Sequence, residues 1–504
     1  MRRLQLFAAL VVLAGCTSTA PLPASDSVSE ARGGDEATFT VLHINDVYEI
    51  TPVEGGRAGG LARVATLRQR LLAEGAPVLT VLAGDFYSPS ALGTARVDGE
   101  RLAGRQMVAV LNALGLDVAA LGNHEFDIDE EAFRDRLTES DFAYVSANVR
   151  PAEGAAPFPG VRPRLVVPLA VAPGDTVRVG FTSVVVPSTV KPYVRYTDPL
   201  STLADEAARL DAEADVEVAL THLAFADDAT AAATIPGLDL VLGGHEHENL
   251  RAYRGPRLVP VLKADANART AYVHRVRLDR ATGAVEVASE LVPITDAIPD
   301  DPAVAAVVAE WVEAAYAGFR ADGFTPERVA VVLGEALDGR EGTVRTRPAR
   351  LGAVIADGFR AAGAADAALF NSGSVRVDDV VAAGPFTEYD AIRVLPFGGE
   401  VLTVRLPGAL LARVLDQGEA NVGTGGYLQR SGLERDGATW TIGGTPLAPD
   451  ATYTIAVSDF LVSGRETGLD YFDAGANPDV EVVGRHGDVR RALLDELVRA
   501  YGAE

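Results

Sequence analysis

The 504-residue sequence contains a single cysteine, Cys16, so no disulfide can form within the chain. Lysine is almost missing as well: Lys191 and Lys263 are the only two, and arginine supplies the other basic side chains. Acidic residues are in excess, and the formal net charge of −25 at pH 7 disfavours nucleic acid polymers as partners of the surface as a whole. An anionic substrate would therefore need local positive charge from arginines or metal ions.

Long apolar runs are also missing, because no stretch of the sequence is long and apolar enough to span a bilayer as a helix. The short apolar run from Leu4 to Leu13 follows two arginines and is typical of an export signal. It ends at Cys16 in a context that resembles a bacterial lipoprotein cleavage site; an ordinary secretory signal with a chance cysteine is the alternative. We predict a lipoprotein signal peptide at residues 1–16, a flexible tether at residues 17–37, and an exported protein held at the cell envelope membrane by a lipid on Cys16.

Hydrophobic residues make up 48% of the chain, which supports full cores, and the length exceeds that of a typical single domain. From Thr38 onward, strand-like and helix-like segments alternate, which favours α/β sheets with helices on both faces. The pattern changes near Pro299, where one amphipathic helix, Val304–Phe319, precedes a new α/β set that includes a strand at Ile392–Leu395. We predict a first domain at residues 38–297, a linker helix within residues 298–328, and a second domain at residues 329–504.

Polar side chains follow five strand-like segments of the first domain, at the point where each strand ends. In open α/β sheets, ligands bind at these ends. Four of the seven histidines lie there, whereas His43, inside a strand, is interpreted as a packed histidine. The strand-end residues are Asp46, Asp85, Asn123 with His124, His222, and His245 with His247.

Histidine, aspartate and asparagine without thiolates suit Zn, Mn, Fe or Co. The set holds more ligands than one tetrahedral ion needs, so a site for two metal ions is the economical interpretation. Two cations about 3.5–4 Å apart can clamp a phosphate and activate the attacking water. The glycine-rich segment Gly55–Gly60 lacks the Lys-Ser/Thr of a phosphate-binding loop and is interpreted as a turn.

Together these motifs resemble the calcineurin-like metallophosphatase signature, in the version of the secreted 5′-nucleotidase family. The resemblance implies an α/β fold: a four-layer α/β/β/α sandwich, a linker helix and a C-terminal α/β substrate-binding domain. It also implies two divalent ions (Zn, Mn, Co or Fe) and a catalytic dyad of His124 and Asp127. By the same resemblance Asp85 bridges the ions, Asp46 and His247 hold one of them, and Asn123, His222 and His245 hold the other.

One position departs from the family pattern, which has Asp-x-His at the first strand end. Here Asp46 is followed two positions later by Tyr48. A phenol with an ordinary pKa near 10 is a poorer ligand than imidazole. Weaker metal binding, ligation by a Tyr48 phenolate, and replacement by water or Glu49 all stay open.

The second half resembles the C-terminal domain of 5′-nucleotidases. The motifs that match contain Arg345, Asn371-Ser-Gly-Ser-Val-Arg376, Pro396-Phe-Gly-Gly399, Tyr427 and Phe460. The resemblance implies that Arg345 and Arg376 bind phosphate oxygens, that Asn371 binds the base or sugar, and that Tyr427 and Phe460 stack on the nucleobase. The family's Gly-Gly-Asp-Gly-Phe motif is absent, so the acid that binds ribose stays open between Glu466 and Asp470.

The function implied is hydrolysis of nucleoside 5′-monophosphates by a water that two metal ions activate, with closure of the domains about residues 298–328 as a hypothesis. No protein partner is evident from the sequence. Two alternatives stay open. One is a 2′,3′-cyclic nucleotide phosphodiesterase or UDP-sugar pyrophosphatase that uses the same site. The other is a nucleotide-binding surface lipoprotein whose metal site has decayed.

Overall fold

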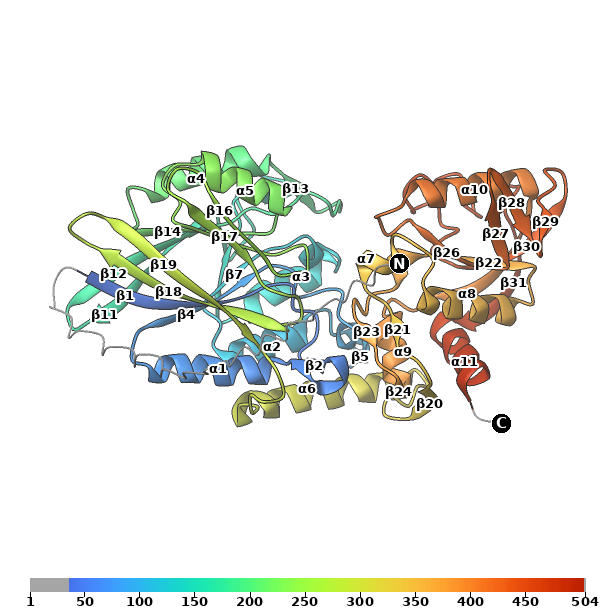
Figure 1. Ribbon diagram of the computed structural model, residues 1–504, viewed down its shortest axis with the longest axis horizontal. Helices are drawn as coiled ribbons and strands as arrows, with labels where there is room; N and C mark the ends of the chain where they lie inside the picture. Colours follow the sequence, from blue (N-terminus) through green and yellow to red (C-terminus); the bar gives the residue numbers. More distant parts are fainter. Residues whose placement is uncertain (1–35, 503–504) are drawn as a thin grey trace, which may run out of the picture.

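The computed structural model describes residues 36–502 of the chain. An N-terminal domain extends to strand β19 (Ala284–Pro293), helix α6 (Pro302–Ala321) follows it, and a C-terminal domain begins at strand β20 (Val329–Leu333) (Figure 1). The first strand, β1 (Glu36–Ile44), begins before residue 38, so residues 36 and 37 belong to the sheet and not to the tether. The predicted signal peptide, Cys16 and the rest of the tether lie outside the described residues.

The centre of the N-terminal domain is a β-sheet stacked face to face on a second sheet, with apolar side chains such as Phe39, Val81 and Val218 packed between them. The first sheet has the order β10 (Val161–Arg162), β8 (Ala143–Val145), β7 (Val118–Ala120), β4 (Val78–Ala83), β1, β18 (Thr270–Asp279) and β19. The second has the order β11 (Arg164–Ala172), β12 (Asp175–Thr182), β14 (Val216–Thr221), β15 (Leu240–Gly243), β17 (Val259–Lys263) and β16 (Leu250–Arg254).

Helices cover the outer face of each sheet (Figure 1). The first sheet packs on α1 (Leu61–Ala73) and α2 (Arg105–Leu114), with α3 (Glu130–Glu139) beside α2 and α6 against α1 and α2. The second sheet packs on α4 (Pro199–Leu210) and α5 (Phe225–Thr234). The predicted four-layer α/β/β/α sandwich is therefore confirmed. Shorter elements of this domain are β2 (Pro52–Val53), β3 (Ala58–Gly59), β5 (Arg96–Val97), β6 (Glu100–Arg101), β9 (Val149–Pro151) and β13 (Val194–Tyr196).

Local sequence explains these elements. Every residue of β4 is buried, as expected for a central parallel strand that is covered on both faces. In β1, successive side chains alternate between the core that separates the sheets and the core beneath the helices, because strands have a period of two. Helix α6 begins where the Asp301 carboxylate accepts hydrogen bonds from the amides of Ala303 and Val304, with Pro302 at the first helical position.

The C-terminal domain has a sheet with the order β26 (Leu428–Ser431), β22 (Ala367–Asn371), β30 (Thr452–Ser458), β25 (Glu400–Pro407) and β31 (Glu481–Asp488). Helices α8 (Arg350–Gly363) and α11 (Val489–Tyr501) cover one face, and α10 (Gly408–Ala420) covers the other. Shorter elements are β21 (Leu337–Asp338), α7 (Glu341–Val344), β23 (Val380–Val381), β24 (Gly384–Thr387), β27 (Leu433–Asp436), β28 (Thr439–Ile442) and β29 (Thr445–Pro446).

The strand predicted at Ile392–Leu395 is wrong, because that segment belongs to helix α9 (Glu388–Val394). A capping box begins the helix: the Thr387 side chain accepts from the amide of Asp390, and the Asp390 carboxylate accepts from the amide of Thr387. This local signal outweighs the strand propensity of a short apolar run.

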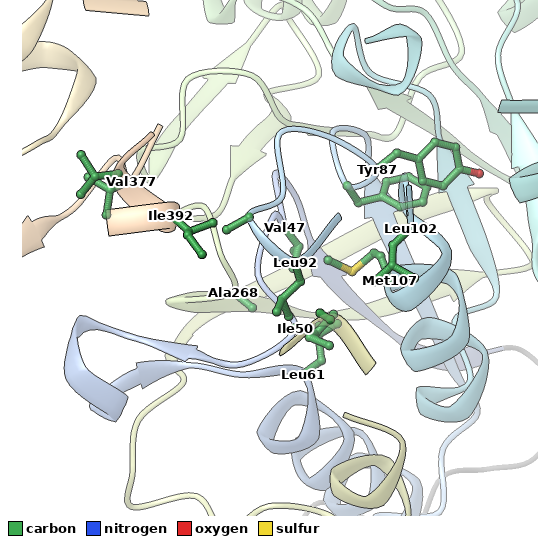
Figure 2. Packing of buried hydrophobic residues seen from close by; sticks show 14 of the residues in the cluster. Val47, Ile50, Leu61, Tyr87, Leu92, Leu102, Met107, Ala268, Val377 and Ile392 are labelled. Carbon is green, nitrogen blue, oxygen red and sulfur yellow. The ribbon is translucent and has the colours of Figure 1, made fainter. Parts of the chain in front are cut away.

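The domains share a hydrophobic contact and several polar ones. Val47 and Ile50 of the N-terminal domain belong to the same buried cluster as Val377 and Ile392 of the C-terminal domain (Figure 2). Beside this cluster, the Tyr389 hydroxyl donates to the Glu49 carboxylate at 3.3 Å. The Glu49 side chain therefore serves the domain interface.

Candidate metal and phosphoester site

The predicted metal ligands come together because β1, β4 and β7 of the first sheet and β14 and β15 of the second are parallel strands. Their carboxyl ends meet at the same edge of the sandwich. Asp46, Asp85 and His222 place one ligand atom each within 4.8 Å of one another. Nε2 of His222 lies 3.0 Å from the Asp85 carboxylate, while its Nδ1 donates to the carbonyl oxygen of Ala83 at 2.8 Å, which fixes the ring orientation.

The loop after β15 brings in the remaining two histidines. The backbone amide of His245 donates to the Asp46 carboxylate at 2.9 Å, and Nε2 of His247 lies 3.7 Å from the same carboxylate. Asp46, Asp85, His245 and His247 all have left-handed backbones, with φ of 52°, 58°, 97° and 63°. Such conformations are disfavoured for residues with a Cβ, and they gather at functional sites.

Two glycines make room for these side chains. A Cβ at Gly122 would lie 2.1 Å from Oδ1 of Asp85, and one at Gly244 would lie 2.8 Å from Oδ2 of Asp46. Any larger residue at either position would displace a candidate ligand.

Glu125 is fully buried and binds the backbone that follows strand β4. Its carboxylate accepts hydrogen bonds from the amides of Asp85 at 2.9 Å, Phe86 at 2.7 Å and Tyr87 at 3.1 Å. Glu125 thus holds the loop that presents Asp85.

His124 and Asp127 form a close pair, with Nδ1 of the imidazole 2.6 Å from the carboxylate. The amide of His124 also donates to Asp85 at 2.8 Å, which ties the pair to the metal ligands. On the other side, the Arg376 guanidinium of the C-terminal domain lies 3.4 Å from Nε2 of His124. The imidazole of His124 and the guanidinium of Arg376 therefore meet at the boundary between the two domains.

Tyr48 stands at the position where the sequence departs from the family's Asp-x-His pattern, and it lies among the candidate ligands. Its hydroxyl lies 2.8 Å from Nε2 of His247, 3.2 Å from Asp85 and 3.5 Å from Asp46. Burial and the charges of Asp85 and Asp46 raise the pKa of Tyr48 well above its usual value. The phenol therefore stays protonated beside these carboxylates.

The residues fit divalent metal binding. Oδ1 of Asn123 is buried and has no hydrogen-bond partner among the described residues, which leaves it free to coordinate an ion. Burial alone lowers the pKa of His222, but the nearby charges of Asp85 and Asp46 outweigh it and raise the pKa overall. The negative field that favours the protonated imidazole equally favours a bound cation.

A cavity of about 620 Å³ adjoins this site and is lined by both domains. Asp127 contributes from the N-terminal domain, and Asn371, Phe397 and Phe460 contribute from the C-terminal domain. Tyr427, expected to stack opposite Phe460, is not among the lining residues; it is buried, with 2% of its surface exposed. Phe359 and Phe370 also line the cavity but are buried, whereas Phe397, followed by a pair of glycines, is half exposed and shares the cavity with Phe460.

Arg345 and Arg376 come together on Glu341, whose carboxylate pairs with both guanidinium groups. Both arginine Nε atoms are buried without a hydrogen-bond partner among the described residues. Burial raises the pKa of Glu466, while neighbouring Asn371 opposes the shift. Asp470 is exposed.

Three residues of this region were not predicted from the sequence: Phe397, Glu341 and Asp378, whose carboxylate lies 2.7 Å from Nδ1 of His247. The two glycines after Phe397 were a signal for an aromatic ring in an open site, like the glycines before Tyr427. Nothing local marks Glu341 or Asp378, which reach the site only through the packing of the domains.

Comparisons with known proteins agree with this architecture. The family model described as calcineurin-like phosphoesterase matches residues 39–249, and the model described as 5′-nucleotidase, C-terminal domain, matches residues 329–474. The 5′-nucleotidase of Bos taurus is 27% identical over 494 residues, which cover 85% of this chain and 83% of that protein. The snake venom 5′-nucleotidase of Naja atra is 26% identical and covers 79% of this chain and 81% of its own length.

A solved structure, that of a 5′-nucleotidase precursor from Thermus thermophilus, has the same fold. Its TM-score is 0.75 with 24% sequence identity, over 93% of this chain and 97% of that one. The N-terminal sandwich is thus that of a calcineurin-like phosphoesterase. With the matching C-terminal domain, the chain belongs to the 5′-nucleotidase family of hydrolases.

Proposed function

We propose that this chain hydrolyses the phosphate ester of nucleoside 5′-monophosphates. The observation that carries the proposal is the shared cavity, which brings Asp127 of the dyad to the same space as Asn371, Phe397 and Phe460. A nucleobase between the two phenylalanines would gain about 1–3 kcal/mol from stacking. Its 5′-phosphate would then extend toward His124 and the strand-end carboxylates.

Asp46, Asp85 and His247 would hold one divalent ion, and Asp85, Asn123, His222 and His245 the other, with Zn, Mn, Co or Fe as candidates. When bound, the two ions would supply Lewis acidity toward the phosphoryl oxygens and lower the pKa of water.

The chain's own residues supply binding and charge. Arg376 directs its positive charge, and His124 its imidazole, held by Asp127 at 2.6 Å, toward one place, where a phosphoryl group would develop negative charge. Arg345 and Arg376 bind Glu341, and a phosphate with paired oxygens would compete with this carboxylate for both guanidinium groups. Glu466, the neighbour of Asn371, is the acid we favour for the ribose hydroxyls.

A substrate panel tests the proposal. AMP, 2′,3′-cyclic AMP and UDP-glucose are supplied in parallel with Mn²⁺ or Zn²⁺ and with an EDTA control. We expect AMP to give the highest kcat/KM and EDTA to abolish turnover. Preference for the cyclic nucleotide or for UDP-glucose would replace the proposal with a phosphodiesterase or a pyrophosphatase that uses the same residues.

Tyr48 is the observation that favours a second candidate, a nucleotide-binding lipoprotein with a decayed metal site. Metal analysis of the wild type and of the Asp85→Asn and His245→Ala variants separates the two. Failure of the metal-loaded wild type to hydrolyse every substrate of the panel, together with retained AMP binding, would establish the binding protein.

We also propose that the chain is exported and anchored by a lipid on Cys16. None of the described helices is long and apolar enough to cross a membrane. Globomycin sensitivity of processing, or a Cys16→Ser variant that leaves the membrane fraction, would support the anchor; unchanged fractionation of Cys16→Ser would refute it.

A further inference from the structure

Lys263, one of only two lysines in the sequence, lies at the end of β17 with 1% of its side chain exposed. Its ammonium donates to the main-chain oxygens of Leu223 at 2.6 Å and Gly244 at 2.7 Å. It also pairs with the carboxylates of Glu246 at 2.5 Å and Asp228 at 2.9 Å. A buried ammonium surrounded by four acceptors in this way is fixed in position.

These acceptors belong to the loops that carry the candidate histidine ligands. Leu223 directly follows His222, and Gly244 directly precedes His245. Glu246 joins the loops a second time, because its other carboxylate oxygen accepts from the amide of Phe225. The ammonium and Glu246 therefore bridge the ends of β14 and β15.

The loop after β15 needs such support. His245 and His247 have φ of 97° and 63°, in the left-handed region. Conformations of this kind persist only where the surrounding structure holds them. Glu246, between the two histidines, directs its carboxylate to Lys263, and this contact anchors the loop at its middle residue.

The site accepts a lysine but has no room for an arginine. A Cβ at Gly243 would lie 2.8 Å from Cε of Lys263, so the stem passes tightly against the backbone. The three donors of a compact ammonium point out of any one plane toward acceptors that converge from different directions, whereas the donors of a guanidinium are confined to a single plane. A chain that otherwise uses arginine almost throughout has lysine where this geometry requires it.

We propose that Lys263 is a positioning residue, whose buried charge fixes the His222 loop against the loop of His245 and His247 in the placement that metal binding needs. The inference rests on the proposed metal site. Lys263 acts through the main chain and through Glu246, and it contacts neither the substrate nor the predicted ligand atoms.

The test compares Lys263→Met with Arg136→Met in the full chain. Arg136 is a matched control, because it is a buried cation of the same domain that donates to the carbonyl oxygens of Leu102 and Ala103 and pairs with Glu139. In EDTA-treated protein, we expect amide hydrogen exchange within residues 222–225 and 243–247 to accelerate at least tenfold in Lys263→Met. The Arg136→Met protein should keep the wild-type rates in these loops.

A Co²⁺ titration followed by visible absorption gives the second readout. We expect Lys263→Met to bind Co²⁺ at least tenfold more weakly and with a changed absorption envelope, while Arg136→Met keeps the wild-type affinity and envelope. Unchanged exchange and Co²⁺ affinity in Lys263→Met, or an equal loss in Arg136→Met, would overturn the proposal. If Lys263→Met fails to fold, Glu246→Gln gives the same comparison. Amide exchange is measured without metal or substrate, so its result does not depend on whether the protein hydrolyses nucleotides. A failure of the proposed function can thus be told apart from a failure of this inference.

Discussion

The Asp378 carboxylate of the C-terminal domain lies 2.7 Å from Nδ1 of His247, a candidate metal ligand of the N-terminal domain. The other carboxylate oxygen accepts from the amide of Glu341 at 2.8 Å, so the group is held in place from its own domain. Burial lowers the pKa of His247, but the bond to Asp378 and the charge of Asp46 outweigh it and raise the pKa to about 9. The C-terminal domain thus orients a candidate metal ligand of the N-terminal domain.

We expect Asp378→Asn to weaken divalent metal binding by about 10-fold, because carboxylates that orient metal-bound histidines typically contribute 10- to 100-fold in affinity. Isothermal titration with Mn²⁺ measures the change. Asp379→Asn is the matched control: Asp379 also crosses the domain interface, accepting from the amide of Glu54 at 3.2 Å, but does not reach His247. Equal losses in both variants would show that the interface matters and that the orientation of His247 does not.

Tyr48→His should tighten metal binding by roughly 10-fold and raise activity at limiting metal, because imidazole is a better ligand than a protonated phenol. Tyr48→Phe removes the hydroxyl alone and should leave metal affinity near that of the wild type. Metal dependence of AMP hydrolysis, measured for the three proteins side by side, checks both expectations. A large loss of affinity in Tyr48→Phe would mean that the phenol itself serves as a ligand.

The strand-end residues could be predicted because their signals are local. A parallel strand places the residue after its last hydrogen bond at the sheet edge, so Asp46 and Asp85 could be grouped from one sheet, whereas His222 joins them from the second sheet. Their close approach within 4.8 Å agrees with that expectation. The stacking of one sheet on the other followed from the family resemblance alone.

Residues that depend on domain packing were not predictable in this way. Asp378 is separated from His247 by 131 positions, and no periodicity links them. Tyr427 and Phe397 both stand beside glycines, so local sequence did not distinguish the buried aromatic from the one that lines the cavity. The helix at Glu388–Val394 was missed because its capping box was overlooked, although that signal was present in the sequence.

Phe397→Ala and Phe460→Ala should each raise KM for AMP by roughly 5- to 150-fold with a smaller effect on kcat, because a stacking contact contributes about 1–3 kcal/mol. Steady-state kinetics with AMP measure the change. Tyr427→Phe is the control, since that ring is buried away from the cavity and loses only its hydroxyl. If Tyr427→Phe raises KM as much as Phe397→Ala does, Tyr427 contacts the nucleobase after all.

His43 and His274 are fully buried between the sheets, with ring centroids 5.8 Å apart. Burial lowers the pKa of His43 to about 3, helped by the charge of Lys263, and lowers the pKa of His274 well below its usual value. The unfolded chain binds protons at these histidines as the pH falls below about 6.5, whereas the folded chain does not. Stability must therefore decrease as the pH falls from about 6.5 toward 3.

His43→Leu should remove part of this acid sensitivity. Protonation of one histidine in the unfolded chain alone costs about 2 kcal/mol of stability between pH 7 and pH 5, and the variant should lose that difference. Thermal unfolding of EDTA-treated protein at both pH values measures it, with His486→Leu as the control because His486 is exposed on β31. A decrease in Tm between pH 7 and pH 5 that is as large in His43→Leu as in the wild type would mean that buried carboxylates, and not the neutral histidines between the sheets, govern acid stability.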